Sequence, residues 1–208
     1  MPRWEPDARV RLQQAALALY HEQGFDATTV EQIAEHAGLT KRTFFRHFSD
    51  KREVLFAGGE DLEGMFVRAV RSAPPSVGAL DAVALGLEAL AGKFDAQGEP
   101  ATRLFRIVRA SPELWERQLI KFASMAEAVA RALRARGVGD PAAILAAESG
   151  ITALRVASDR WIRNSRKKSL RDLIGEALSE LRAVAYPETS VGRNKRISAK
   201  ARSRRTQY

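Results

Sequence analysis

The 208-residue sequence contains no cysteine, which excludes disulfide bonds and thiolate metal sites. Its three histidines, His21, His36 and His47, lack metal-ligand spacing, and neither a G-x-S-x-G motif nor a phosphate-binding glycine loop is present. We therefore expect no enzymatic activity, no cofactor and no bound metal. The sequence also has no secretory apolar segment and no apolar run long enough to span a bilayer, so we expect a cytoplasmic protein without membrane contact.

Positive charge, a formal net +9, is concentrated in the last part of the chain. Residues 187–208 carry seven Lys or Arg and one acid, whereas the other 186 residues carry 27 basic and 24 acidic side chains. The segment 187–208 has no apolar periodicity, which predicts a disordered basic tail. Such a tail either adds salt-sensitive, sequence-independent affinity for DNA or has no role in binding.

Residues 28–51, TTVEQIAEHAGLTKRTFFRHFSDK, have the pattern of a helix-turn-helix. Thr28 and Thr29 are each followed three residues later by Glu or Gln, which is the capping-box pattern of a helix start. Apolar residues then recur at helical spacing up to Gly38, which can adopt the positive φ of a tight turn. A second short helix is predicted to begin at Thr40.

The second helix combines an apolar anchor with a basic free side. Phe44 and Phe48 lie four residues apart and can hold it to the rest of the domain. Residues 40–52 contain five Lys or Arg and one acid, and the free side carries Lys41, Arg42, Thr43, Arg46 and His47. A short basic helix held in this way is suited to insertion into the major groove of DNA.

Lys51 is predicted to lie at the start of a third helix, with Ser49 or Asp50 as N-cap and Glu53 as capping partner. The helix dipole disfavours a cation at this position by roughly 0.3–1 kcal/mol. A DNA phosphate beside the helix end would favour both the free N–H groups and the lysine. Lys51 is therefore a candidate phosphate contact.

The run beginning at Ala16 resembles the DNA-binding domain of the TetR family of bacterial transcriptional regulators. The resemblance covers roughly the first quarter of the chain, and it is carried by Gly24-Phe25, Thr28-Thr29, Ile33-Ala34, Ala37-Gly38-Leu39, His47-Phe48 and Lys51. It implies DNA contacts at the helix starts, along the second helix and at the lysine, which gives the set Thr28, Thr29, Thr40, Lys41, Arg42, Thr43, Phe45, His47 and Lys51.

Two of these positions depart from the family's common residues. Arg42 stands where many members have Gly or Ala, so it can add a base contact. Phe45 stands where a Tyr often donates its hydroxyl to a phosphate, so it can only pack against a sugar or a thymine methyl.

The rest of the chain is predicted to be helical. The third helix should run from about Asp50 through Val70, interrupted by Gly58-Gly59 and Gly64, to a break at residues 72–77. Further helices are predicted at 81–93, 100–109 and 112–136, and from about 140 and about 169. The expected fold is all-α, with a three-helix helix-turn-helix DNA-binding domain at 1–52, a larger helical-bundle ligand-binding and dimerisation domain at 53–186, and a basic tail at 187–208.

The resemblance implies that the last two helices pair with those of a second copy in a homodimer. The residues expected at this interface are Ile151, Leu154, Trp161, Leu170, Leu173, Ile174, Ala177, Leu178 and Leu181. The alternative is that both helices only fill the core of their own subunit.

The resemblance also implies an apolar cavity for a small-molecule effector in the larger domain. Candidate wall residues are Phe94, Phe105, Trp115, Phe122, Met125 and Trp161. The alternative is an ordinary core, because aromatic residues at helical spacing more often fill one.

Together these features predict a sequence-specific DNA-binding transcriptional regulator. We expect a homodimeric repressor that binds a near-palindromic operator on double-stranded DNA and is released by a lipophilic small molecule. One alternative is a non-specific architectural DNA-binding protein driven by the tail, which should give no footprint. Another is a ligand-binding module with a vestigial DNA-binding head, which should not bind DNA at physiological salt.

Overall fold

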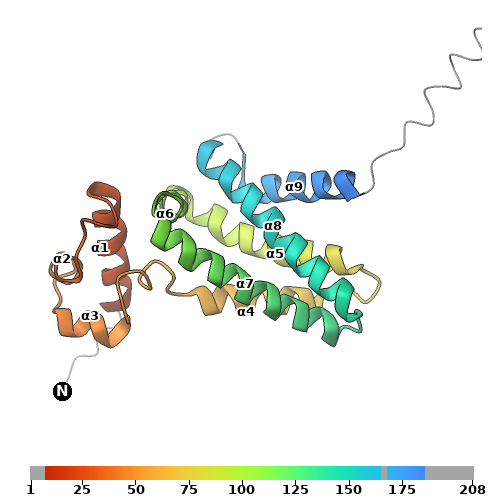
Figure 1. Ribbon diagram of the computed structural model, residues 1–208, viewed down its shortest axis with the longest axis horizontal. Coiled ribbons are helices and arrows are strands. Elements are labelled where there is room, and N and C mark those ends of the chain that lie inside the picture. The colour runs from red at the N-terminus through yellow and green to blue at the C-terminus, as the bar shows by residue number, and fades with distance from the viewer. Residues whose placement is uncertain (1–7, 165–167, 186–208) are drawn as a thin grey trace, which may run out of the picture.

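The computed structural model describes residues 8–164 and 168–185, and within these ranges the protein consists of nine α-helices and no β-strand (Figure 1). This confirms the predicted all-α fold. The predicted basic tail, residues 187–208, lies outside the described residues. The helices are α1 (Ala8–Glu22), α2 (Val30–His36), α3 (Lys41–His47), α4 (Gly59–Ser72), α5 (Ala79–Gln97), α6 (Glu99–Ala110), α7 (Pro112–Ala135), α8 (Asp140–Asn164) and α9 (Leu170–Ala185).

Helices α1, α2 and α3 form a small N-terminal unit, here called the head (Figure 1). One stripe of α1 faces inward because Leu12, Ala15 and Ala16 recur at helical spacing. Gly24 has a φ of 86°, so the chain can turn sharply after α1, as its sequence position suggested. The core of the head is completed by Tyr20, Phe25, Ile33, Ala34, Ala37, Phe44 and Phe48.

The helix predicted from Asp50 begins instead at Gly59, and residues 49–58 form a series of turns that we call the connector. Asp50 does accept hydrogen bonds from the Arg52 and Glu53 amides, at 2.8 and 3.2 Å, as the predicted N-cap should. The turns do not extend into a helix because Gly58, with a φ of 87°, interrupts the helical backbone just before α4. The sequence-based helix boundary was therefore wrong by about two turns.

The connector packs with the head as well as leading away from it. Val54 and Leu55 are buried in the same apolar cluster as the head residues. We propose the domain boundary at residue 52. It assigns Val54 and Leu55 to the second domain, although both pack with the head.

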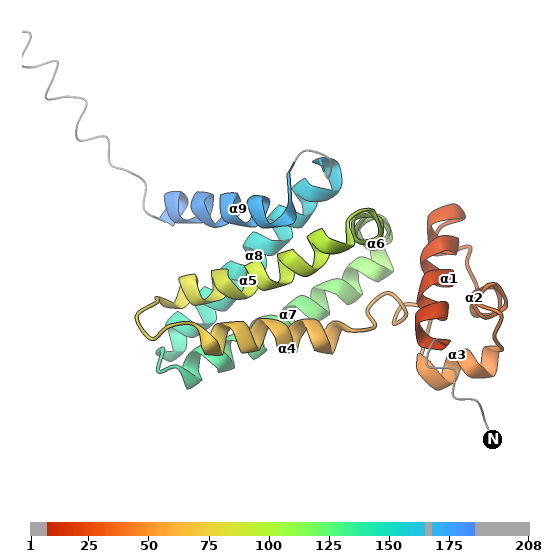
Figure 2. The same ribbon diagram turned by 180° about the vertical axis from the view of Figure 1, so that it is seen from behind.

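Helices α4–α9 form the larger unit, here called the bundle, in three tiers: α9 on one side, α5 and α8 in the middle, and α4 and α7 on the other (Figures 1 and 2). Its continuous core runs from Phe66 and Val70 of α4 to Leu173 and Ile174 of α9. The helix positions agree with those predicted between residues 81 and 185. None of the helices in the described ranges is both long and apolar enough to cross a membrane.

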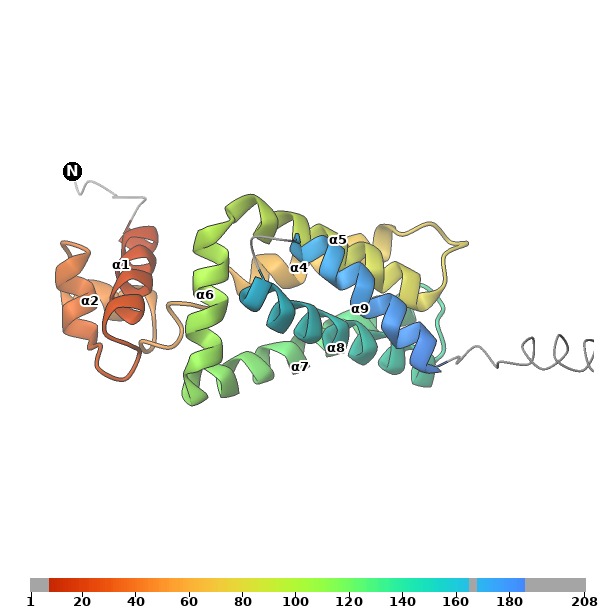
Figure 3. The same cartoon turned by 90° about the horizontal axis from the view of Figure 1, so that it is seen from above.

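Helix α6 lies across the end of the bundle and separates it from the head (Figure 3). Ile107 and Val108 of α6, together with Leu114 of α7, are buried in the apolar cluster of the head. The head is thus attached to the bundle by side-chain packing in addition to the connector.

The residues expected at a dimer interface fill the subunit's own core. Of the nine, all except Leu181 are less than 9% exposed within this single subunit. The eight buried residues belong to the apolar core of the bundle, where α8 and α9 contact each other and α5. Their place in a dimer interface stays a prediction, because apolar periodicity marks the buried face of a helix without telling which neighbour covers it. The apolar side chains of α8 and α9 that do remain exposed are Ile144, Leu145, Val156 and Val184.

Tight packing between α4 and α5 at Gly86 supplies a test of the bundle. A Cβ added at Gly86 of α5 would lie 2.2 Å from Cδ2 of Phe66, whose side chain is fully buried. We expect Gly86→Ala to lower the free energy of unfolding by about 1–3 kcal/mol because the ring cannot move aside.

Gly64→Ala in α4 is the matched control, because the nearest atom to its added Cβ is the mobile guanidinium of Arg68 at 3.0 Å. There the higher helix propensity of Ala should raise stability by up to about 1 kcal/mol. Urea unfolding followed by circular dichroism at one fixed protein concentration measures both. Equal stability changes at the two positions would contradict the close packing at Gly86.

Candidate DNA-binding surface and regulatory cavity

The helix-turn-helix is held in shape by two local devices. Thr29 is the N-cap of α2 and makes a full capping box, with its hydroxyl 3.2 Å from the Gln32 amide and the Gln32 side chain 2.8 Å from the Thr29 amide. Gly38 adopts a φ of 65° in the turn, and Arg11 of α1 donates hydrogen bonds to the Ala37 and Gly38 carbonyls. The turn is thereby fixed both by its own conformation and by a side chain from α1.

Helix α3 is seated on the head by its predicted anchors. Phe44 is completely buried and Phe48 nearly so. Thr40 caps the helix start, with its hydroxyl accepting a hydrogen bond from the Thr43 amide at 3.1 Å. Because the apolar stripe faces the head, the opposite side of α3 faces solvent.

The solvent-facing side of α3 carries two arginines and an aromatic ring. Arg42 and Arg46 are exposed, and neither makes a hydrogen bond or ion pair with any described residue. Phe45 is 50% exposed and rests edge-on against Phe44 at 5.4 Å between ring centroids. These side chains are free to contact another molecule.

Lys41, the first residue of α3, is exposed and paired with Glu31 of α2. The hydrogen bond from Lys41 lowers the pKa of Glu31. This pair links the two helices of the motif, and a DNA phosphate would have to compete with Glu31 for the lysine.

The Thr28 side chain does not reach the surface in this conformation, so the structure gives its predicted DNA contact no support. Its side chain is 1% exposed, and its hydroxyl donates to the Gly24 carbonyl at 2.7 Å and accepts from Gln23 at 3.2 Å. It closes the loop between α1 and α2. Thr29 and Thr40 cap helices, and the Thr43 amide donates to Thr40, yet all three threonines remain at least partly accessible.

His47 lies half-buried at the end of α3, and its Nε2 is shielded from water without a hydrogen-bond partner among the described residues. Burial, followed by the nearby charges of Arg46 and Arg9, lowers the pKa of the imidazole. The ring is therefore neutral at pH 7. The tautomer protonated at Nε2 could donate to a phosphate that reaches it.

Lys51 is engaged within the head. Its ammonium donates to the Phe25 carbonyl at 2.8 Å, the Thr28 carbonyl at 3.0 Å and the Asp26 carbonyl at 3.4 Å, and it lies 4.1 Å from the centroid of the Phe25 ring. The Tyr20 hydroxyl in turn donates to the Lys51 carbonyl at 2.6 Å. The lysine thus ties the connector to the loop between α1 and α2, a role that its sequence position did not suggest.

A cavity of about 510 Å³, here called the junction cavity, lies where the connector meets the bundle. This volume is within the range of about 300–1,000 Å³ that is common for small-molecule sites. Its walls come from the connector and from five helices of the bundle, with Gln13 of α1 at its edge. Its apolar lining includes Leu55, Phe56, Leu62, Leu90, Leu104, Val108 and Leu154.

Four of the six predicted pocket residues, Phe94, Phe105, Phe122 and Met125, also line the junction cavity. Trp161 does not; it is buried and packs edge-on against Phe105 at 5.7 Å. Trp115 borders a much smaller space of about 20 Å³ beside Arg109, whose guanidinium lies 4.4 Å from its ring centroid.

Several cavity residues were missed by the sequence analysis, above all residues 55–58 of the connector, Gly59 at the start of α4, and two lysines, Lys93 and Lys121. No pattern in the sequence could have found them, since they come from segments far apart in the chain. What brings them together is the start of α4 at Gly59, which leaves the connector against the bundle.

The head and the bundle together define a class of protein, a helix-turn-helix DNA-binding unit joined to an all-helical domain with its own cavity. Comparison with known proteins agrees with this class. Residues 12–57 match the family described as "Bacterial regulatory proteins, tetR family". The HTH-type transcriptional regulator TcmR of Streptomyces glaucescens is 32% identical over 134 residues, which are 62% of this chain and 59% of TcmR. YerO of Bacillus subtilis, an uncharacterized HTH-type regulator, is 29% identical over 66 residues, or 32% of this chain and 23% of YerO.

The solved structures of related proteins share the fold over most of the chain. The SmeT–triclosan complex superposes with a TM-score of 0.63 at 21% identity, covering 88% of this chain and 93% of SmeT. SmeT is the repressor of the Stenotrophomonas maltophilia multidrug efflux pump SmeDEF. The fatty acid degradation regulator FadR from Bacillus halodurans superposes with a TM-score of 0.56 at 16% identity. The superposition covers 83% of this chain and 93% of FadR.

Residues 12–57 are therefore similar to the DNA-binding region of TetR-family transcriptional regulators, and the similarity to TcmR extends this likeness over 134 residues. Regulators of this family are transcription factors rather than enzymes, which agrees with the lack of catalytic motifs in the sequence. The matched regions span less than two thirds of TcmR and YerO, so the function of the whole chain is argued below from its own residues.

The position of Lys51 predicts that this side chain stabilises the head even without DNA, which a phosphate contact alone would not do. Lys51→Met keeps much of the apolar stem and removes the ammonium that binds three carbonyls. We expect it to reduce stability by about 1–3 kcal/mol, since the partly buried carbonyls of Phe25 and Thr28 lose a charged donor. Thermal unfolding without DNA measures this.

Arg42→Met is the control, because Arg42 makes no polar contact with any described residue. It should leave the melting temperature unchanged. An unchanged melting temperature for Lys51→Met as well would mean that the lysine does not stabilise the head.

Proposed function

We propose that this chain is a homodimeric repressor that binds a near-palindromic operator and leaves it when a small molecule fills the junction cavity. The observation that carries the proposal is the solvent-facing side of α3. Arg42, Phe45 and Arg46 project from a helix whose opposite side is buried through Phe44. Arginine reads guanine by two parallel hydrogen bonds in the major groove, and an aromatic side chain can contact a thymine methyl.

Reading an operator of two half-sites requires two heads. Two-fold symmetry would place the α3 helices in successive major grooves, about one turn or roughly 34–36 Å apart. The surface proposed for pairing is formed by the exposed apolar side chains of α8 and α9, of which Leu145 is 67% exposed. Self-pairing of the same face is the usual arrangement of a two-fold dimer.

The junction cavity is the proposed effector site because the connector forms part of its wall. A ligand there touches residues 55–59, which join the head to α4. To release DNA the ligand must bind the non-binding arrangement of the heads more tightly than the DNA-binding one. A lipophilic ligand fits the aromatic and aliphatic lining. Triclosan is a ligand of SmeT, and the cavity of this chain has its own lining. With a chromosomal operator as partner, the proposed location is the cytoplasm.

Selection of binding sites from random double-stranded DNA, followed by footprinting, tests the proposal. We expect a near-palindromic sequence whose two half-sites are protected on one face of the DNA. Binding without sequence preference or footprint would favour an architectural protein. No binding at physiological salt would favour a ligand-binding module with a vestigial head.

Arg42 provides the sharpest test of sequence reading. Arg42→Ala should weaken binding to the selected operator by about 1–3 kcal/mol and relax the preference at one base pair, with a smaller effect on random DNA. Fluorescence anisotropy on both DNAs measures this.

Arg68→Ala is a suitable control, since Arg68 is an exposed arginine on α4 away from α3. It should change neither affinity appreciably. Equal losses for Arg42→Ala on operator and random DNA would show that Arg42 contacts only the phosphates.

A further inference from the structure

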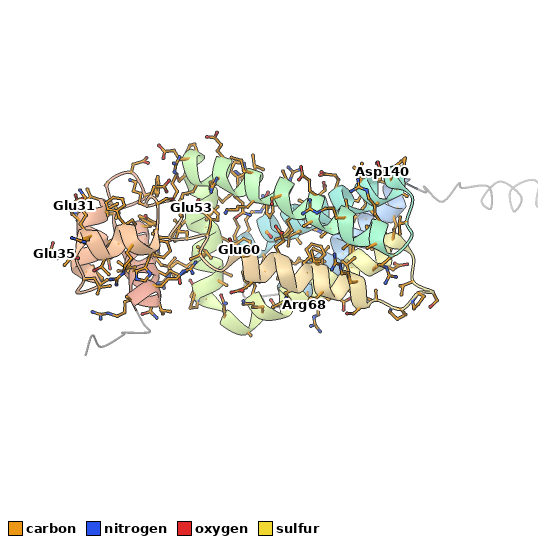
Figure 4. All side chains as sticks on the ribbon, turned by 90° about the horizontal axis from the view of Figure 1, so that it is seen from below. Glu31, Glu35, Glu53, Glu60, Arg68 and Asp140 are labelled. Atoms are coloured by element: carbon orange, nitrogen blue, oxygen red, sulfur yellow. The ribbon has the colours of Figure 1, made fainter. Side chains whose placement is uncertain are left out.

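A three-residue ion cluster joins the connector to the bundle. Glu53 of the connector accepts a hydrogen bond from Arg117 of α7, and its other carboxylate oxygen lies 3.7 Å from the ammonium of Lys121, one turn further along the same helix. Figure 4 shows Glu53 between the head and the bundle. All three side chains are partly shielded from water, Glu53 most of all at 22% exposure. Their attraction is therefore screened less than that of a surface ion pair.

Lys121 belongs to this cluster and also to the wall of the junction cavity. Its 3.7 Å distance to Glu53 is too long for a direct hydrogen bond, so its donors are incompletely used. A second lysine, Lys93 of α5, lines the same cavity, is half-buried and makes no ion pair or hydrogen bond with any described residue. The cavity therefore offers two ammonium groups with spare donors.

Two acids also line the cavity, and both are accommodated by the protein itself. Glu63 of α4 accepts a hydrogen bond from Ser124 at 3.4 Å. Glu60 is exposed in the first turn of α4, where the helix dipole favours a negative charge. Lys93, which has no polar partner among the described residues, and Lys121, which has only the long ion pair with Glu53, thus lie next to an apolar interior. This interior is formed by Leu90, Phe94, Leu104, Phe105, Phe122, Met125 and Leu154.

From this arrangement we infer that the cavity takes an amphipathic anion. Its apolar part lies among the aromatic and aliphatic side chains, and its anionic group binds Lys93 and Lys121. In doing so it competes with Glu53 for Lys121 and loosens the attachment of the connector to α7. The inference rests on the proposed function, for which it supplies both the chemical class of the effector and the contact through which the effector acts.

Competition has a consequence that a merely structural role for Glu53 would not have. If Glu53 and the ligand share Lys121, removing the charge of Glu53 must strengthen binding of an anion and leave a neutral ligand unaffected. Removing the charge of Lys121 must weaken binding of the anion. A residue needed only for folding would weaken binding of both ligands together.

Calorimetric titration of the full-length protein without DNA tests this, with decanoate, decanol and decylamine as probes of one chain length and three charges. We expect decanoate to bind most tightly of the three. Lys121→Gln and Lys93→Gln should each weaken decanoate binding about tenfold, the loss of one charge-assisted hydrogen bond, with little effect on decanol. Glu53→Gln should strengthen decanoate binding severalfold.

Glu127→Gln is the matched control for Glu53→Gln. It makes the same change of charge at an acid of α7 that pairs with Arg131 on the exposed side and does not line the cavity. It should leave decanoate affinity unchanged. Thermal unfolding establishes whether each variant is folded. If Lys121→Gln does not fold, Lys93→Gln by itself tests the anion site.

Three results would overturn the inference: no decanoate binding below its micellar concentration, equal or tighter binding of decanol or decylamine, or weaker decanoate binding in Glu53→Gln. None of these depends on DNA. A failure of the protein to select an operator would instead count against the proposed function, so the two failures can be told apart.

Discussion

The recognition helix α3 has only seven residues, and a helix of that length is not stable by itself in water. It exists in this protein because Phe44 is fully buried in the head and because Thr40 and the Gly38 turn fix its start. The same burial decides which side of α3 faces outward. The free arginines, the exposed Phe45 and the half-buried His47 all follow from this one packing contact.

The next constraint is the attachment of the head to the bundle. Ile107, Val108 and Leu114 extend the head's apolar core into α6 and α7, and Glu53 adds an ion cluster beside it. Apolar packing is non-directional, so it holds the two units together without fixing a single angle between them. The ion pairs are directional, and Lys121 belongs both to them and to the wall of the junction cavity. The junction cavity, the connector and the head are in this way joined by shared contacts.

Much of the fold was predictable because each element carries its own local signal. The capping box at Thr29, the positive φ of Gly38 and the anchors Phe44 and Phe48 are local features, and all appear as expected. What local signals did not reveal are the contacts that other residues make within the folded subunit. Thr28 bonds to Gly24 and Gln23, Lys51 binds the carbonyls of Phe25 and Thr28, and the apolar faces of α8 and α9 are covered within the subunit.

The sequence by itself determined the all-α class, the helix-turn-helix and the basic free side of its second helix, since helical periodicity, caps and turn glycines act over a few residues. Only the tertiary structure decided that the connector is not helical, that Lys51 serves the head, and that Lys93 and Lys121 share a cavity with the connector. The reason is physical: a side chain's role depends on which atoms surround it, and those atoms come from segments that the chain brings together only when it is folded.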